Sequence, residues 1–316
     1  MKKIFAFVLM AVLVLSLSTA AFAAPAYNVG ICQLVQHPAL DAATQGFIDA
    51  LKAEIPDVEI DLQNASGDSA TCATITNTFA SNGVDLIMAN ATPALQAAVA
   101  ATGDIPILGT SVTDYATALD LEGIGLGTPT GINVSGTSDL APLDGQADMI
   151  TELFPEAKTV GLLYCSAEPN SVFQIQAIRG YLEAKGLTAA EYSFADSNDV
   201  ASVVESAVGA VDVLYIPTDN TAASVTETIA GVVLPGRLPV VAGEEGIAAG
   251  CGVATLTISY YDLGTATGKM AAQILKDGAD VKTMAIQAAP TFTKKYNAAN
   301  AEQLGIAIPE DYQPIE

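Results

Sequence analysis

The feature of this sequence that most constrains its fold is an internal repeat, in which short apolar segments and helical patterns occur twice in the same order. Segment 83–93, GVDLIMANATP, is followed by a helical pattern and then by IPILGTSVTD. Segment 210–221, AVDVLYIPTDNT, is followed in the same way by LPVVAGEEG. In both copies Val-Asp opens an apolar run that leads to a Thr, and the next run follows a Pro and ends in polar residues. This repeat favours two similar lobes over one large sheet.

Runs rich in β-branched residues alternate with helical patterns along the chain, which is typical of parallel sheets built from strand-helix-strand units. The predicted strands are 27–34, 58–63, 86–89, 107–109, 159–164, 191–194, 213–216, 240–242, 253–258 and 283–288. The predicted helices are 40–53, 70–82, 93–102, 145–153, 171–184, 200–209, 221–233, 262–276 and 298–304. Continuously apolar strands indicate that helices cover both faces of each sheet.

We predict an α/β fold in which two similar doubly wound parallel-sheet lobes are joined by a three-strand hinge. The first lobe is assigned to residues 24–135 with 260–290, and the second to residues 136–259 with 291–316. The Gly-, Thr- and Pro-rich stretch 123–136 is interpreted as the crossover between them. A hinge of several crossings permits closure about a cleft.

The first 23 residues have the pattern of a secretory signal peptide. Lys2 and Lys3 precede an apolar core, and Ala21-Phe22-Ala23 forms a cleavage site. The apolar run is shorter than the roughly 20 residues of a membrane span, so we expect cleavage near Ala23 rather than a retained anchor. No Cys stands at that site for lipidation, which favours a free protein in a periplasm. We expect this protein to be a monomer. The net charge of -23 at pH 7 opposes binding to nucleic acid.

The four cysteines suit an oxidising compartment and allow three disulfide pairings. A bridge between Cys32 and Cys72 inside the first lobe is the favoured pair, and Cys165 and Cys251 would then share the second lobe. Buried free thiols are the alternative. Because His37 is the single histidine and no Cys/His cluster occurs, we expect neither a metal site nor a cofactor.

Ligands of open parallel α/β sheets bind beyond the carboxyl ends of the strands, where helix N-termini also converge. The polar residues that follow strands are therefore the candidate ligand-binding residues: Gln36, Thr92, Ser111, Thr113, Asn170, Ser171, Asp219, Asn220 and Glu244. Thr92, which precedes a Pro, also suits a helix N-cap, and Asp219 suits either a cap or the partner of an ammonium group. His37 suits a turn residue as well as a ligand contact.

Motifs for catalysis are missing from this sequence. Gly123, Gly125 and Gly127 follow no clear strand, as a dinucleotide-binding loop would require. P-loop and nucleophile-elbow patterns do not occur, and a Ser-His-Asp triad would have to use His37. An enzyme on a similar fold is thus an alternative without a motif to support it.

Long segments of the chain match a known family in order. They include NVGICQLVQHPALDAATQGFIDAL, VSGTSDL, VGLLYCSAEPNSVFQI, PVVAGEEG and ATLTISYYDLGTATGKMAAQILKDGAD. With these segments the chain resembles the ABC transporter substrate-binding protein family that includes tryptophan-binding and related aromatic amino-acid-binding members. The resemblance implies a type I periplasmic binding fold that closes on its ligand. It also implies delivery of that ligand to an inner-membrane permease with a cytoplasmic ATPase.

The resemblance also implies which residues bind the ligand. Those in matching motifs are Thr92 in ATP, Ser111 and Thr113 in TSVTD, Asn170 and Ser171 in EPNS, Asp219 and Asn220 in PTDN, and Glu244 in GEE. We therefore expect a non-enzymatic binder of a small zwitterion such as an amino acid. Asp219 is expected to pair with the ammonium group, while Thr92, Ser111 and Thr113 hold the carboxylate. An accessory that presents the ligand to a sensor or chemoreceptor is the alternative role.

Overall fold

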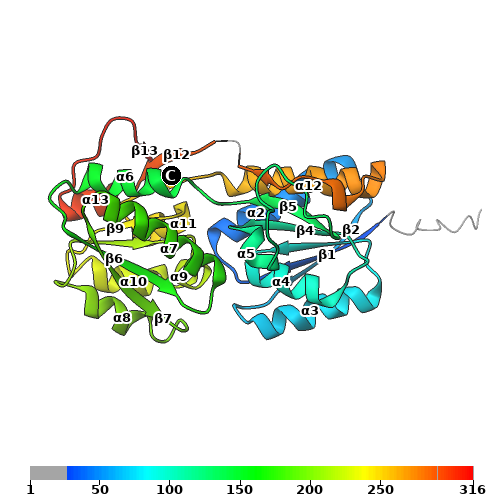
Figure 1. Cartoon of the computed structure of the whole chain (residues 1–316), viewed down its shortest axis with the longest axis horizontal. Helices are drawn as coiled ribbons and strands as arrows, with labels where there is room; N and C mark the ends of the chain where they lie inside the picture. The colour runs from blue at the N-terminus through cyan, green and yellow to red at the C-terminus, as the bar shows by residue number, and fades with distance from the viewer. Residues whose placement is uncertain (1–26, 290, 316) are drawn as a thin grey trace, which may run out of the picture.

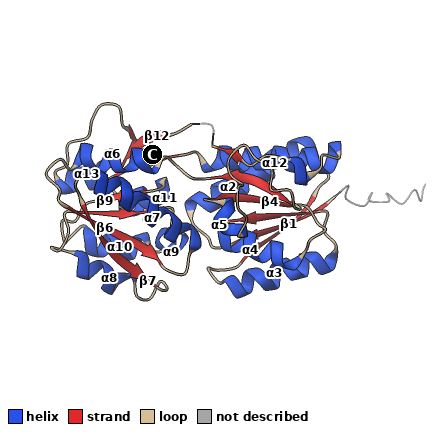
Figure 2. Ribbon diagram, in the orientation of Figure 1, coloured by secondary structure: helices blue, strands red, loops and turns tan. Residues whose placement is uncertain are grey.

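The computed structural model describes residues 27–289 and 291–315, which form two α/β lobes side by side (Figure 1). Helices lie on both faces of each sheet (Figure 2). The predicted signal peptide lies outside the described residues and stays a prediction. No helix within the described ranges is long and apolar enough to cross a membrane.

The sheet of the first lobe is parallel and has the strand order β11-β5-β4-β3-β1-β2. Its strands are β1 (Asn28–Gln33), β2 (Glu59–Asn64), β3 (Leu86–Asn90), β4 (Ile107–Val112), β5 (Val134–Ser138) and β11 (Gln287–Ala288). Its helices are α2 (Pro38–Glu54), α3 (Ser69–Asn82), α4 (Thr92–Ala101), α5 (Tyr115–Leu119), α12 (Tyr260–Asp277) and the 3-10 turn η1 (Val281–Thr283).

The sheet of the second lobe has the order β13-β12-β10-β9-β8-β6-β7, with β12 antiparallel to β10. Its strands are β6 (Thr159–Cys165), β7 (Thr188–Phe194), β8 (Val213–Ile216), β9 (Val240–Ala242), β10 (Ala254–Thr257), β12 (Thr293–Tyr296) and β13 (Gln313–Pro314). Its helices are α6 (Leu143–Leu153), α7 (Pro169–Ala184), α8 (Val200–Ala207), α9 (Asn220–Ser224), α10 (Thr226–Val233), α11 (Glu245–Gly250) and α13 (Ala298–Leu304).

The repeat in the sequence becomes a repeat in space, which confirms the predicted fold class. The order β2-β1-β3-β4-β5 in one sheet corresponds to β7-β6-β8-β9-β10 in the other. The Asp of each Val-Asp pair has the same role. Asp85 accepts a hydrogen bond from the backbone N–H of Asn28 at the start of β1, and Asp212 accepts from those of Lys158 and Thr159 at the start of β6. Each carboxylate thus joins the beginnings of two adjacent strands.

Strand β5 corrects the prediction that residues 123–136 only connect the lobes. Its sequence, VSGTS, lacks the apolar run used to recognise a strand, yet every residue in it is buried. Hydrogen bonds satisfy its hydroxyl groups: Ser135 donates to the carbonyl of Met284, and Thr137 bonds Thr267. Since the chain first crosses to the second lobe after Ser138, the boundary drawn at residue 135 divides this strand.

Helices α2 and α12 pack against each other at very close range. A Cβ atom on Gly264 would overlap the backbone of Ala43, and one on Gly46 would overlap the backbone of Tyr261. Glycine lets two helix backbones approach where any side chain would separate them. Both helices begin beside the other lobe, α2 just after His37 and α12 at Tyr260. Their packing therefore positions these two side chains relative to each other.

The cysteines do not form the predicted bridge. Cys32 and Cys72 are both fully buried, and both thiols are free, as are those of Cys165 and Cys251. A hydrogen bond with the Cys72 side chain, together with burial, raises the pKa of the Cys32 thiol. The structure thus matches the alternative of buried free thiols, which pack as small apolar groups.

Candidate functional site

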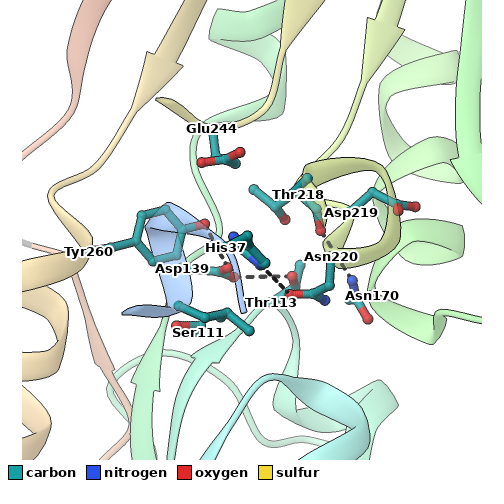
Figure 3. A pocket seen from close by; sticks show the side chains of 12 residues that line it. His37, Ser111, Thr113, Asp139, Asn170, Thr218, Asp219, Asn220, Glu244 and Tyr260 are labelled. Carbon is teal, nitrogen blue, oxygen red and sulfur yellow. Dashed lines mark hydrogen bonds between the residues drawn. The ribbon is translucent and has the colours of Figure 1, made fainter. Parts of the chain in front are cut away.

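A cavity lies between the two lobes (Figure 3). It is lined by side chains of both lobes and of the first crossing: His37, Leu40, Ser111, Thr113, Asp139, Asn170, Thr218, Asp219, Asn220, Ala223, Glu244 and Tyr260. Among the described lining residues none is a Lys or Arg.

Most of the predicted site residues meet in this cavity. Ser111, Thr113, Asn170, Asp219, Asn220 and Glu244 line it, whereas Gln36, Thr92 and Ser171 do not. Ser171 is fully buried behind the lining and donates a hydrogen bond to Asp219 at 2.7 Å. It supports the wall of the cavity instead of facing the space within.

Gln36 and Thr92 are displaced from the cavity by the local backbone. Gln36 is exposed and lines a separate hollow, because the next residue, His37, takes the N-cap position of α2 and faces inward. Thr92 is the first residue of α4, whereas Ala91, with φ of 90°, is the N-cap. The predicted capping role of Thr92 is therefore wrong.

The backbone of β4 aims Ser111 at the cavity. Pairing between β4 and β5 shifts register between Gly109 and Val112, and Ser111 has φ of 54°, in the left-handed region. A bulge of this kind re-aims a side chain at a strand end, and strained residues of this kind often cluster at binding sites. In this conformation Ser111 lines the cavity.

Asp139 is a cavity residue that the sequence analysis missed. It follows β5, and its buried carboxylate accepts hydrogen bonds from Thr113 Oγ1 at 3.1 Å and from the Tyr260 hydroxyl at 3.0 Å. Burial raises the pKa of Asp139 to about 6. The signal was present in VSGTSDL, where polar residues end a strand as they do elsewhere in the repeat, but the strand itself was not recognised.

The other two carboxyl groups in the lining cap helices. Asp219 accepts from the backbone N–H groups of Cys165 and Ala222 at 2.6 and 2.8 Å, besides the hydroxyl of Ser171. Glu244 accepts from the first N–H groups of α11. Burial raises the pKa of each carboxyl group to about 7, and the charge of Glu168 adds to the effect at Asp219. Asp139, by contrast, caps no helix in the described chain.

Several buried polar atoms of the lining lack a partner. Among the described residues, His37 Nδ1, Ser111 Oγ and Asn170 Oδ1 are buried without a hydrogen bond. Buried polar atoms in folded proteins are almost always hydrogen-bonded. These three are half of the six such atoms in the described residues, and a polar ligand in the cavity would supply their missing partners.

Hydrogen bonds across the cleft hold the lobes in a closed arrangement. His37 Nε2 lies 3.3 Å from Asn220 Oδ1, and Gln174 Nε2 donates to Thr113 Oγ1 at 3.4 Å. These contacts would break if the lobes separated, so they belong to the closed form alone.

Comparisons with known proteins match this architecture. Residues 28–313 match the family described as ABC transporter substrate binding protein. A tyrosine-binding protein from Clostridioides difficile (strain R20291) is 38% identical over 253 residues, which cover 79% of this chain and 72% of the relative.

In the described residues a metal-binding group of three or more His, Cys, Asp or Glu side chains is not found.

Solved structures resemble the chain in both sequence and shape. The complex of an ABC domain with L-Trp from Streptococcus pneumoniae is 34% identical, with a TM-score of 0.87 over 92% of this chain and 99% of that one. A ligand-free, open substrate-binding protein from Clostridium difficile is 37% identical but has a TM-score of 0.69, with coverage of 92% and 99%. The described lobes are thus arranged more like those of the ligand complex. The chain belongs to the ABC transporter substrate-binding protein family.

Proposed function

We propose that this chain is a periplasmic solute-binding protein that encloses an aromatic amino acid between its lobes and delivers it, chemically unchanged, to an ABC permease with a cytoplasmic ATPase. The observation that supports this most is the cavity between the lobes, which is lined by carboxyl groups and unpartnered polar atoms of both lobes. The names of the relatives, a tyrosine-binding protein and an L-Trp complex, support an aromatic ligand. We expect the protein to act as a monomer and without a cofactor.

The ammonium group of the ligand pairs with Asp139 in this proposal. Asp219, which the sequence suggested for that role, already accepts two backbone N–H groups and a hydroxyl group. Asp139 accepts from the side chains of Thr113 and Tyr260 and has no cationic neighbour in the described lining. The Ser111 hydroxyl is unpartnered and would donate to the ligand carboxylate. Leu40, Ala223 and the Tyr260 ring supply apolar surface.

L-Tyrosine or L-tryptophan is expected to raise the melting temperature of the purified protein. A ligand that binds only the folded state stabilises it by about 2.7 kcal/mol at a concentration of 100 times its Kd. Thermal unfolding with each of the standard amino acids measures this effect. Myo-inositol, the ligand of a protein with the same fold and 16% identity, is the control and is expected to cause no shift. Stabilisation by a sugar and by no amino acid would contradict the proposal.

Lowering the pH from about 8 to about 5 is expected to weaken ligand binding. Burial raises the pKa of Asp139 to about 6 and that of Glu244 to about 7, and the charge of Asp139 contributes at Glu244. A protonated carboxyl group cannot form an ion pair with an ammonium group. Affinity is therefore highest above these pKa values and falls as the pH drops through them, by up to about tenfold per pH unit for each proton taken up. Calorimetry across this range measures the change.

The stability of the empty closed protein has the opposite pH dependence. A carboxyl group whose pKa is raised by folding stabilises the fold below its ordinary pKa of about 4. That contribution is lost as the pH rises through about 6 for Asp139 and about 7 for Glu244. The increase in melting temperature caused by the ligand should thus be larger at pH 8 than at pH 5. An affinity that stays constant over this range would show that these carboxyl groups do not pair with the ligand.

A further inference from the structure

Glu168 lies behind the cavity and is the centre of its hydrogen-bond network. It precedes α7 and is 4% exposed. From described residues its Oε2 atom accepts hydrogen bonds from Asn170 Nδ2, Asn220 N and Asn220 Nδ2, and its Oε1 atom accepts from Thr221 N and Thr221 Oγ1. Glu168 does not itself line the cavity. Its effect on a ligand would be transmitted through these neighbours.

The carboxylate fixes the orientation of two asparagine side chains. An ionised carboxylate only accepts hydrogen bonds, so the amide nitrogens of Asn170 and Asn220, at 3.0 and 2.7 Å, must face it. The Asn170 nitrogen also donates to the carbonyl oxygen of Thr218 at 3.1 Å, which has the same requirement. Both amide oxygens consequently point away from Glu168. Asn170 Oδ1 is buried and lacks a partner within the described chain, and Asn220 Oδ1 faces His37.

The orientation of Asn220 in turn fixes the tautomer of His37. An amide oxygen only accepts, so the hydrogen bond at 3.3 Å requires the proton to be on Nε2 of the imidazole. In the neutral ring Nδ1 is then a bare acceptor. This atom is buried in the cavity without a partner from the described residues. His37 Nδ1 and Asn170 Oδ1 are therefore both acceptors that a donor on the ligand would satisfy.

Asn170 and Asp139, the proposed ammonium site, occupy different parts of the cavity (Figure 3). Asn170 and Asn220 lie on the side opposite Tyr260, the hydroxyl group of which donates to Asp139 (Figure 3). A ligand whose ammonium group pairs with Asp139 can therefore place a second donor near Asn170. Among the aromatic amino acids, the phenol O–H of tyrosine and the indole N–H of tryptophan are such donors, whereas phenylalanine has none.

We propose that Glu168 is a positioning residue that makes one side of the cavity accept hydrogen bonds only, so that the protein selects aromatic amino acids with a donor on the side chain. This inference rests on the proposed function. A site built to bind a donor rejects an analogue that lacks it, because buried acceptors are then left unpaired. The expected discrimination against L-phenylalanine is about 100-fold or more.

Calorimetry with L-tyrosine, L-tryptophan and L-phenylalanine tests the selectivity. We expect the first two to bind and L-phenylalanine to bind at least about 100-fold more weakly than the better of them. Equal affinity for L-phenylalanine would overturn the inference and leave the proposed function intact. If none of the three bound, the proposed function and the inference that rests on it would both fail.

Nitrogen-15 NMR of the L-tyrosine complex tests the tautomer directly. His37 is the single histidine of the chain, so protein without an affinity tag gives one unambiguous pair of ring nitrogen signals. We expect a proton on Nε2 and an unprotonated Nδ1 whose signal shows an accepted hydrogen bond. A proton on Nδ1, or a doubly protonated ring, would overturn the inference. This measurement needs no variant.

The variant Glu168→Gln tests the positioning role. Its amide group has donors of its own, so the orientations of Asn170 and Asn220 are no longer imposed. We expect the preference for L-tyrosine over L-phenylalanine to fall to within about tenfold and the His37 signals to show mixed tautomers. The matched control is Thr221→Val, which removes one hydroxyl donor to Glu168 but neither asparagine, and it should keep the selectivity. Unchanged selectivity in Glu168→Gln would refute the positioning role. If that variant does not fold, the comparison of ligands and the NMR of the native protein still decide.

Discussion

Replacing Asp139 with asparagine is expected to weaken binding of L-tyrosine or L-tryptophan by about 2–5 kcal/mol, roughly 30- to 5,000-fold. The Asp139 carboxylate is buried and accepts from Thr113 and Tyr260, and the proposed ammonium group is its missing cationic partner. Asparagine preserves the volume but removes the charge, so the ammonium would be buried without an ion pair. Calorimetry of the native protein and the variant at pH 8 measures the loss.

Two further substitutions make this test specific. Glu245 lies next to the lining residue Glu244 but forms an ion pair with Lys295 outside the cavity, at 2.7 Å. Glu245→Gln removes the same charge there and should change affinity by less than about twofold. Asp219→Asn tests the assignment suggested by the sequence. If Asp139→Asn binds like the native protein while Asp219→Asn binds nothing, the ammonium group belongs at Asp219.

Substitution of Gly264 by alanine is expected to lower the free energy of unfolding by about 3 kcal/mol and to weaken ligand binding as well. The added methyl group would overlap the backbone of Ala43, and neither helix backbone can move aside locally. Helices α2 and α12 must then separate, which displaces His37 from Tyr260 at the cavity. Urea unfolding followed by circular dichroism measures the stability, and calorimetry measures the affinity.

Gly180 provides the matched control for this substitution. It lies in the exposed part of α7, and a Cβ atom there would have no neighbour within 4 Å in the described structure. Gly180→Ala is expected to stabilise the protein by about 0.5–1 kcal/mol, because alanine loses less backbone entropy than glycine in a helix. If Gly264→Ala is as stable as this control, the close approach of α2 and α12 is not required.

The cavity also indicates why closure should depend on the ligand. Asp139, Asp219 and Glu244 are buried together, and the charge of Asp139 raises the pKa of Glu244 beyond the effect of burial. Closing the empty cleft at neutral pH therefore requires ionised carboxyl groups to lose water or to take up protons. A cationic group between them offsets this cost, so ligand binding shifts the population towards the closed form. The different TM-scores to a ligand complex and to an open, ligand-free relative fit this view.

Much of the fold could be predicted because its signals are local. The predicted strands 213–216 and 240–242 and the predicted helix 298–304 agree with β8, β9 and α13 at both ends. An apolar run before a polar strand end is visible in any short window of sequence. Strand β5 was missed since its small polar residues become buried only through partners such as Met284 and Thr267, which are distant in the sequence.

The sequence by itself determined the fold class, the repeated lobes and the set of strand ends where polar side chains gather. The tertiary structure alone decided which of those side chains share the cavity: it brought in Asp139, His37 and Tyr260 and moved Gln36 and Thr92 out. It also decided their hydrogen-bond roles. Glu168 orients Asn220, and Asn220 fixes the tautomer of His37, which lies 131 positions before Glu168 in the sequence. The physical reason is the distance along the chain over which each effect acts. Periodicity and turns act over a few residues, whereas the direction of a hydrogen bond depends on groups that meet only when the lobes close.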